Sequence, residues 1–223
     1  MKNRVLVLAP HPDDEVLGCG GIMKKFSEQG VEVFVLVITK GTPKYYSIDK
    51  INNVREEALA AHKILGVSET AFLDFYAPEL DTTNKSEISR EISKYLSQWG
   101  VSDLFIPHRG DIHHDHRAVF EAALVAARPV GDYSVKNIYA YETLSETEWA
   151  PPFGDDAFIP THFVNIENEM EFKLEAMKCF RSQVRPFPST RSIETIEAIS
   201  KFRGATVGFR RAESFMTIRT IIN

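Results

Sequence analysis

The sequence predicts an α/β fold of three layers, in which a mostly parallel sheet lies between two layers of helices. The first observation behind this prediction is that short apolar runs of strand length alternate with segments whose apolar residues recur at helical spacing. The second is the chain length of 223 residues, which suits one domain, with 43% hydrophobic and 26% charged residues. The third is that no stretch approaches the ~18 consecutive apolar residues of a membrane span. We therefore expect a single domain, 1–223, that does not cross a membrane.

Five strands are expected in the first two thirds of the chain. The run VEVFVLVI is apolar throughout and rich in β-branched residues, as is typical of a strand covered on both faces. In chain order the expected strands are 4–9, 31–38, 71–75, 103–107 and 137–143. A Rossmann-like, doubly wound sheet of this kind has the strand order 3-2-1-4-5, which places the first and fourth strands side by side.

Helices are expected between these strands, with glycines directly after two of them. Their expected ranges are 15–29, 52–65, 86–99 and 116–127. From Trp149 the pattern changes, because two helices near 170–181 and 193–203 precede a single strand near 213–222. We expect residues 1–148 to form the α/β core and residues 149–223 a small C-terminal appendage that packs on it.

Charge and cysteine content exclude several classes of protein. Lys and Arg number 26 against 31 Asp and Glu, a net charge of −5, and no basic run is present that could follow a phosphate backbone, so nucleic acid is not an expected partner. Cys19 and Cys179 lie far apart and form no CxxC motif, which indicates neither a disulfide framework nor a thiolate zinc site. The apolar run 5–9 is too short for a signal peptide, so we expect a cytoplasmic protein.

The first strand leads into a turn of unusual composition, Pro-His-Pro-Asp-Asp-Glu at residues 10–15. One interpretation is helix capping, because acidic side chains stabilise the N-terminus of a helix and proline is favoured in its first turn. The other is metal binding, because imidazole and carboxylate together form a ligand set suited to zinc or ferrous iron. The turn alone leaves both interpretations open.

The fourth strand leads into a second polar segment, in which four of the seven histidines fall within residues 108–116. A solvated polar loop before a capped helix is one interpretation of this segment, and metal binding is the other. In the expected strand order, the first and fourth strands are neighbours, and ligands bind beyond their carboxyl ends. Both polar segments follow those ends, so together they favour a metal site.

The two segments, APHPDDE and DIHHDHRAV, resemble the motifs AHPDDE and HxDH of the LmbE-like, or PIG-L type, zinc deacetylases. The similarity continues through VREEALAAHKILGV, FRSQ and RGATVGFRRAESF, and so extends over nearly the whole chain. Pro10 is a difference of one residue, outside the positions that bind metal. The resemblance implies a Rossmann-like deacetylase that removes the N-acetyl group of a glucosamine derivative.

The resemblance also implies roles for individual residues. The implied metal ligands are His11, Asp14 and His116, with Zn²⁺ as the expected ion and Fe²⁺ as an alternative. Three protein ligands are the pattern of a catalytic zinc site rather than a structural one. The implied roles of the residues around the metal are general base for Asp13, oxyanion donor for His113 and orientation of an imidazole for Asp115.

The sequence defines the substrate contacts less sharply, and it leaves alternative functions open. Arg55 falls where the family has a substrate-contacting arginine, and Arg185 and Arg191 flank a Pro-Phe-Pro segment where they could hold an anionic group. The expected partner is a small N-acetylated amino sugar, and a homo-oligomer is possible because several relatives form one. The alternatives are an inactive nucleotide-binding or regulatory domain, an amide hydrolase with a non-sugar substrate, and a Mg²⁺ phosphohydrolase, which the histidines disfavour.

Overall fold

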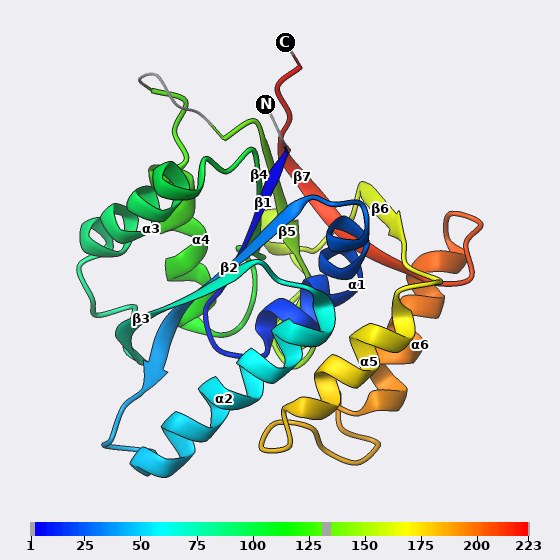
Figure 1. The fold of residues 1–223 in the computed structure, drawn as a ribbon, viewed down its shortest axis with the longest axis horizontal. Helices are drawn as coiled ribbons and strands as arrows, with labels where there is room; N and C mark the ends of the chain where they lie inside the picture. The colour runs from blue at the N-terminus through cyan, green and yellow to red at the C-terminus, as the bar shows by residue number, and fades with distance from the viewer. Residues whose placement is uncertain (1–2, 131–134, 223) are drawn as a thin grey trace.

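The computed structural model describes residues 3–130 and 135–222, which form a seven-stranded sheet with helices on both faces (Figure 1). The strand order is β3-β2-β1-β4-β5-β7-β6. The first five strands are parallel to one another, and β7 is antiparallel to both β5 and β6. The strands are β1 (Arg4–Ala9), β2 (Glu32–Gly41), β3 (Glu69–Ala77), β4 (Asp103–Pro107), β5 (Asn137–Tyr141), β6 (His162–Asn165) and β7 (Ala212–Arg219).

Two apolar cores, one on each face, hold the helices against the sheet. Side chains alternate along β1, so that Val5 and Val7 enter one core and Leu6 and Leu8 the other. The first core contains residues of α1, α2, α5 and α6, and the second contains residues of α3 and α4 (Figure 1). The helices are α1 (Asp14–Glu28), α2 (Ile48–Leu65), α3 (Lys85–Trp99), α4 (His114–Ala126), α5 (Met170–Cys179) and α6 (Ile193–Ala205), with a short 3-10 helix, η1 (Gly154–Asp156).

The three-layer α/β class and the expected order of the first five strands are confirmed. The sheet is wider than expected, because β7 pairs with β5 and β6 adds a further strand at the edge. The sequence analysis did not predict β6, which has only four residues and begins with a histidine. Both extra strands come from residues 149–223, so the C-terminal segment extends the central sheet as well as covering one face of it.

A buried ion pair from this C-terminal segment is joined to the middle of α1. The carboxylate of Glu213, on β7, accepts hydrogen bonds from the backbone N–H groups of Gly21 and Ile22, each at 2.7 Å. Lys173, on α5, donates both to Glu213 and to the carbonyl oxygen of Leu17. Glycines let these groups approach, because a Cβ on Gly20 would lie 2.9 Å from the Lys173 side chain. The last strand thus helps to position α1.

The helices in residues 3–130 and 135–222 include none that is long and apolar enough to cross a membrane.

Candidate metal centre and catalytic site

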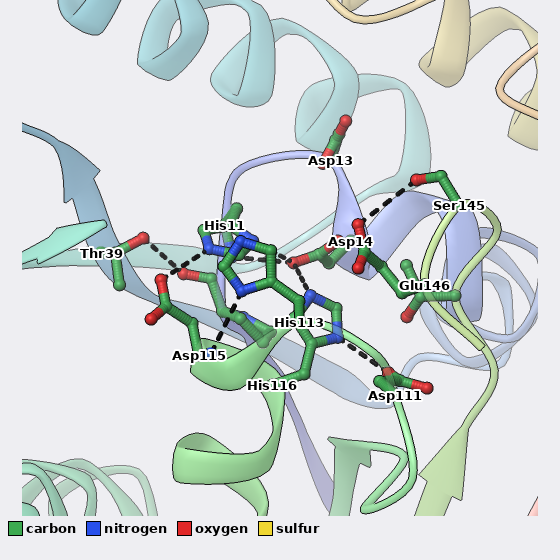
Figure 2. Close-up of polar contacts among 12 residues, drawn as sticks. His11, Asp13, Asp14, Thr39, Asp111, His113, Asp115, His116, Ser145 and Glu146 are labelled. Carbon is green, nitrogen blue, oxygen red and sulfur yellow. Dashed lines mark hydrogen bonds and ion pairs between the residues drawn. The ribbon is translucent and has the colours of Figure 1, made fainter. Parts of the chain in front are cut away.

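The candidate site lies where β1 and β4 end and α1 and α4 begin. The strands are direct neighbours in the sheet, so the two polar segments that follow them meet at one edge. Figure 2 shows His11, Asp14 and His116 converging there, with Asp111 and Asp115 on their outer sides. The sequence interpretation that joined the two segments therefore agrees with their placement.

The three expected metal ligands have the spacing of a metal site. The distances from Asp14 Oδ2 to His11 Nδ1 and to His116 Nε2 are both 3.2 Å. Ligand atoms about 2.1 Å from a tetrahedral ion lie roughly 3.4 Å from one another, so the observed spacing leaves room for an ion between them. His116 Nε2 and Asp14 Oδ1 are buried and have no hydrogen-bond partner, as expected of atoms that serve another ligand.

Two carboxylates outside this set fix which ring nitrogens face the ion position. Asp111 Oδ2 lies 2.8 Å from His116 Nδ1, and Asp115 Oδ2 lies 3.0 Å from His11 Nε2. Each carboxylate accepts a hydrogen bond from the N–H of the imidazole nitrogen beside it. The lone pair of the neutral ring is then on the opposite nitrogen, His116 Nε2 or His11 Nδ1. Both lone pairs then point toward Asp14. Asp111 is itself held by Thr147, whose hydroxyl donates to Asp111 Oδ1 at 2.6 Å.

A second group, formed by His11, His113 and Asp115, also has ligand spacing but fits an ion less well. Both carboxylate oxygens of Asp115 are already occupied, Oδ2 by His11 and Oδ1 by the backbone N–H of Leu80 at 3.0 Å. Asp115 therefore orients His11, the kind of role that the resemblance implied for it. The donor set of His11, Asp14 and His116 fits Zn²⁺ or Fe²⁺.

Charges in this cluster are strongly coupled. Burial raises the pKa of Asp14, but the facing imidazoles of His116 and His11 outweigh burial and hold this pKa well below its usual range. Burial lowers the pKa of His11, but hydrogen bonds to Asp115 and Asp14 outweigh it and raise the pKa to about 9. The carboxylates therefore favour positive charge at this position, which a divalent cation would supply.

His113 stands beside the ligands as a neutral donor. Its Nδ1 accepts a hydrogen bond from the backbone N–H of Asp115 at 3.1 Å, so His113 is also the N-cap of α4. Burial and the neighbouring His11 lower the pKa of His113 to about 4. A neutral ring with Nδ1 as acceptor carries its proton on Nε2. His113 lines the pocket and can donate this proton in a hydrogen bond to a bound oxygen.

Asp13 occupies a special backbone conformation at the start of α1. Its φ is 112°, in the left-handed region that residues other than glycine seldom adopt. The buried carboxylate of Glu15 accepts the Asp13 N–H at 3.2 Å and also contacts His62 Nε2 at 2.9 Å. Glu15 and His62 were not among the expected site residues, yet together they fix the turn that presents Asp13.

The Asp13 side chain is paired with an arginine from the C-terminal segment. Arg191 Nη1 lies 2.9 Å from Asp13 Oδ2 and also donates to Gln183 Oε1, while Nε donates to the Ser145 hydroxyl. Burial raises the pKa of Asp13 to about 8, although the guanidinium of Arg191 opposes this shift. A pKa near neutrality suits a group that first accepts and then returns a proton.

A pocket of about 250 Å³ opens onto this site. Its walls come from the ends of β1, β2 and β3, from the start of α2 and from the loops that carry His113, Glu146 and Arg191. Burial raises the pKa of Glu146 to about 7, although the nearby imidazole of His116 opposes this shift. The lining residues are His11, Pro12, Asp13, Thr39, Gly41, Tyr46, Lys50, Ile51, Val54, Ala77, Pro78, His113, Glu146, Gln183 and Arg191.

Two of the three arginines expected to bind substrate do not line this pocket. Arg55 donates to the carbonyl oxygen of Leu73 and pairs with Asp74 at 3.0 Å, on β3. Arg185 donates to the carbonyl oxygens of Ser182 and Val184. Arg191 does line the pocket, but its guanidinium is bound to Asp13.

Only two of the four histidines in the segment 108–116 lie at the site. His113 and His116 join the site, whereas His114 is largely exposed beside Asp81 and His108 contacts the backbone oxygen of Asp156 at 2.9 Å. Asp111 was not among the expected site residues. Its position, five residues before the implied ligand His116, was the signal that could have identified it. Tyr46, Lys50 and Glu146 were not expected either, because they belong to no motif and the sequence held no signal for them.

Comparisons with known proteins show the family to which the chain belongs. Residues 6–127 match the family described as PIG-L, GlcNAc-PI de-N-acetylase, and the chain belongs to this family. An uncharacterized deacetylase of Escherichia coli K12, YaiS, is 30% identical over 190 residues, which cover 81% of this chain and 92% of the relative. A probable N-acetyl-α-D-glucosaminyl L-malate deacetylase 2 of Bacillus cereus is 25% identical over 229 residues, 98% of this chain and 99% of the relative.

A solved deacetylase structure has a fold similar to that of this chain. The N,N'-diacetylchitobiose deacetylase of Pyrococcus horikoshii superposes with a TM-score of 0.78 at 26% sequence identity. The match covers 97% of this chain and 84% of that protein. These similarities support an enzyme of the deacetylase class on a fold that carries the His-Asp-His site.

Proposed function

We propose that this protein is a metal-dependent N-deacetylase, which hydrolyses the N-acetyl amide of a glucosamine derivative to acetate and a free amine. The observation that carries the proposal is the convergence of His11, Asp14 and His116, with Asp13 and His113 lining the pocket that opens onto them. The similarity to deacetylases of N-acetylated sugars supports the substrate class. Two free cysteines are compatible with the cytoplasm, which we propose as the location.

His11, Asp14 and His116 would hold the metal, and Zn²⁺ or Fe²⁺ fits these donors. A divalent cation bound there supplies a Lewis acid that polarises the amide carbonyl and makes water more acidic. Asp111 and Asp115 hold the two imidazoles in the tautomers that this binding requires.

Asp13 is the proposed general base. Arg191 occupies Oδ2, which leaves Oδ1 to accept a proton from the attacking water and to return it to the nitrogen of the leaving amine. The water oxygen becomes an oxygen of the acetate. The proton that Asp13 returns to the nitrogen lets the carbon–nitrogen bond break, and the amine leaves.

His113 is the proposed oxyanion donor. The α4 N-cap position fixes the His113 ring, which lines the pocket. Its lowered pKa keeps the ring neutral, with the proton on Nε2. When the carbonyl carbon becomes tetrahedral, its oxygen gains negative charge, and a fixed donor stabilises that charge more than it stabilises the ground state.

The test is acetate release from a panel of N-acetylglucosaminides by protein treated with a chelator and then reloaded with Zn²⁺. We expect equal amounts of acetate and new primary amine, loss of both after chelation, and no product from His116→Ala. A panel that gives no free amine, together with tight binding of a nucleotide, would favour the alternative of an inactive binding domain.

A further inference from the structure

The pocket has a buried, polar inner end and an exposed outer end. Asp13 and Thr39 at the inner end are buried, whereas Tyr46, Lys50 and Pro78 at the outer end are exposed. A sugar whose N-acetyl group reaches the inner end must therefore direct its remaining substituents past this outer end.

Packing and hydrogen bonds hold the outer end of the pocket in a defined conformation. The ring of Tyr46 packs over Gly41 at the end of β2, where an added Cβ would lie 2.8 Å from Tyr46 Cδ2 and 3.1 Å from Ile51 Cγ1. The backbone N–H of Tyr46 is bound to the carbonyl oxygen of Thr42 at 3.0 Å. A side chain at position 41 would therefore push the Tyr46 ring out of this position.

Lys50 places a free positive charge beside this ring. Its Nζ lies 5.0 Å from the centroid of Tyr46, and its backbone N–H is fixed by the N-cap hydroxyl of Ser47. Within residues 3–130 and 135–222 its ammonium forms no ion pair, whereas the guanidinium of Arg191 at the inner end is already bound to Asp13. Lys50 and Arg191 are the lysine and arginine side chains among the described lining residues. Because Arg191 is paired with Asp13, Lys50 is the one whose charge remains available for an anion.

We propose that Tyr46 and Lys50 form a subsite for an anionic substituent, a carboxylate or a phosphate, on the sugar. This inference rests on the proposed deacetylase function and narrows its substrate class. A lysine ammonium binds either anion as a point charge, and the tyrosine ring holds that charge at the pocket mouth.

The neighbouring pair Lys44 and Tyr45 provides a matched control. Lys44 Nζ lies 5.0 Å from the Tyr45 ring, in the same loop, but neither residue lines the pocket. Lys44→Ala removes the same charge and the same kind of cation–π contact without changing the subsite.

The experiment is calorimetric binding of three deacetylated sugars, so that no turnover is needed. The probes are glucosaminyl malate for a carboxylate, glucosamine 1-phosphate for a phosphate and methyl glucosaminide as the neutral reference. We expect at least one anionic probe to bind the wild type more tightly than the neutral probe. Lys50→Ala should weaken that binding about 10-fold to 100-fold while leaving methyl glucosaminide unchanged, and Lys44→Ala should change neither.

The anionic probe that loses more affinity in Lys50→Ala identifies the group that the subsite takes. The proposal is overturned if the wild type has no preference for an anion, if the preference survives Lys50→Ala, or if Lys44→Ala removes it equally. Lys50-dependent binding without acetate release from any N-acetylated counterpart would support the subsite and contradict the proposed deacetylation, so the two failures are distinguishable.

Discussion

At the scale of single residues, neighbouring carboxylates in one turn differ in role because their partners differ. Asp14 faces two imidazoles, and Asp13 faces Arg191 and the pocket. The side chain that points toward the imidazoles can hold a cation, and the side chain that points into the pocket can move a proton. The dipeptide Asp-Asp by itself carries no indication of this difference, which the resemblance to the deacetylase family implied. In the structure, the backbone at Asp13 has a φ of 112°.

A substitution separates the two roles. Asp13→Asn keeps the size of the side chain but cannot accept a proton, so we expect kcat to fall roughly 10² to 10⁴-fold with metal content unchanged. Asp14→Asn should lose the metal. Elemental analysis beside acetate-release kinetics measures both effects, and metal loss in Asp13→Asn with retention in Asp14→Asn would exchange the two assignments.

Arg191 is expected to act through Asp13. Arg191→Met removes the charge-assisted hydrogen bond that holds Asp13 Oδ2, so kcat should fall about 10-fold to 100-fold while KM changes little. Arg191→Lys, which keeps the charge but cannot contact Asp13, Ser145 and Gln183 together, should recover part of the loss. Steady-state kinetics decides the matter, because a rise in KM at constant kcat would indicate a substrate contact instead.

At the scale of helices and strands, α1 depends on groups distant in the chain. Lys173 and Glu213 are almost fully buried, and each bonds to the backbone of α1 as well as to its partner. A buried carboxylate without its cation is costly, because neither water nor another positive group compensates its charge. The ion pair therefore couples α5 and β7 to the helix that begins at the site.

Lys173→Met should reduce the free energy of unfolding by about 3 to 5 kcal/mol, since it leaves the Glu213 charge unpaired. Lys178→Met, on the same helix, removes an exposed pair with Glu175 and should change the free energy of unfolding little, because solvent screens exposed ion pairs. Urea denaturation of both variants provides the comparison. Similar small losses in the two would show that Lys173 contributes no more than a surface lysine.

The sequence predicted those elements whose signal is local. The apolar runs of β1 and β4 gave strand bounds that agree with the structure, 4–9 and 103–107. The beginning of α2 was placed four residues late, because two charged residues interrupt the apolar pattern of its first turn and its N-cap Ser47 was not recognised. The short edge strand β6 had too few apolar residues to be distinguished from a loop.

The candidate site was predictable where its signal is local. Its proposed ligands lie in two short segments whose meeting follows from strand order, so topology was sufficient to join them. The partners of Asp13 and α1 were not predictable, because 178 residues separate Asp13 from Arg191 and 192 separate Gly21 from Glu213. Contacts at such separations leave no periodic signal in one sequence.

At the scale of the whole molecule, metal binding and stability should be linked through protons. The folded chain raises the pKa of His11 from 6.5 to about 9, so the metal-free protein gains stability from this proton below pH 6.5 and loses that gain as the pH rises toward 9. A bound metal replaces the proton and avoids the loss. Stabilisation by the metal should therefore grow with pH.

Calorimetry of chelated and zinc-loaded protein at pH 6.5 and pH 9 tests this linkage. We expect the chelated protein to lose about 1 to 3 kcal/mol between the two pH values and the difference in Tm between the two forms to widen. A difference that stays constant, or that is larger at pH 6.5, would contradict the assignment of His11 as a ligand.

The hydrogen bonds from the α1 backbone to Glu213 have a consequence for the order in which the site forms during synthesis. The proposed ligands His11, Asp14 and His116 all precede β5 in the chain, whereas the helix that carries Asp14 is anchored by Glu213, which is made much later. A nascent chain that has not reached β7 lacks this anchor, so we expect it to hold Asp14 less firmly. We therefore expect a stable site to form only after β7 has been made.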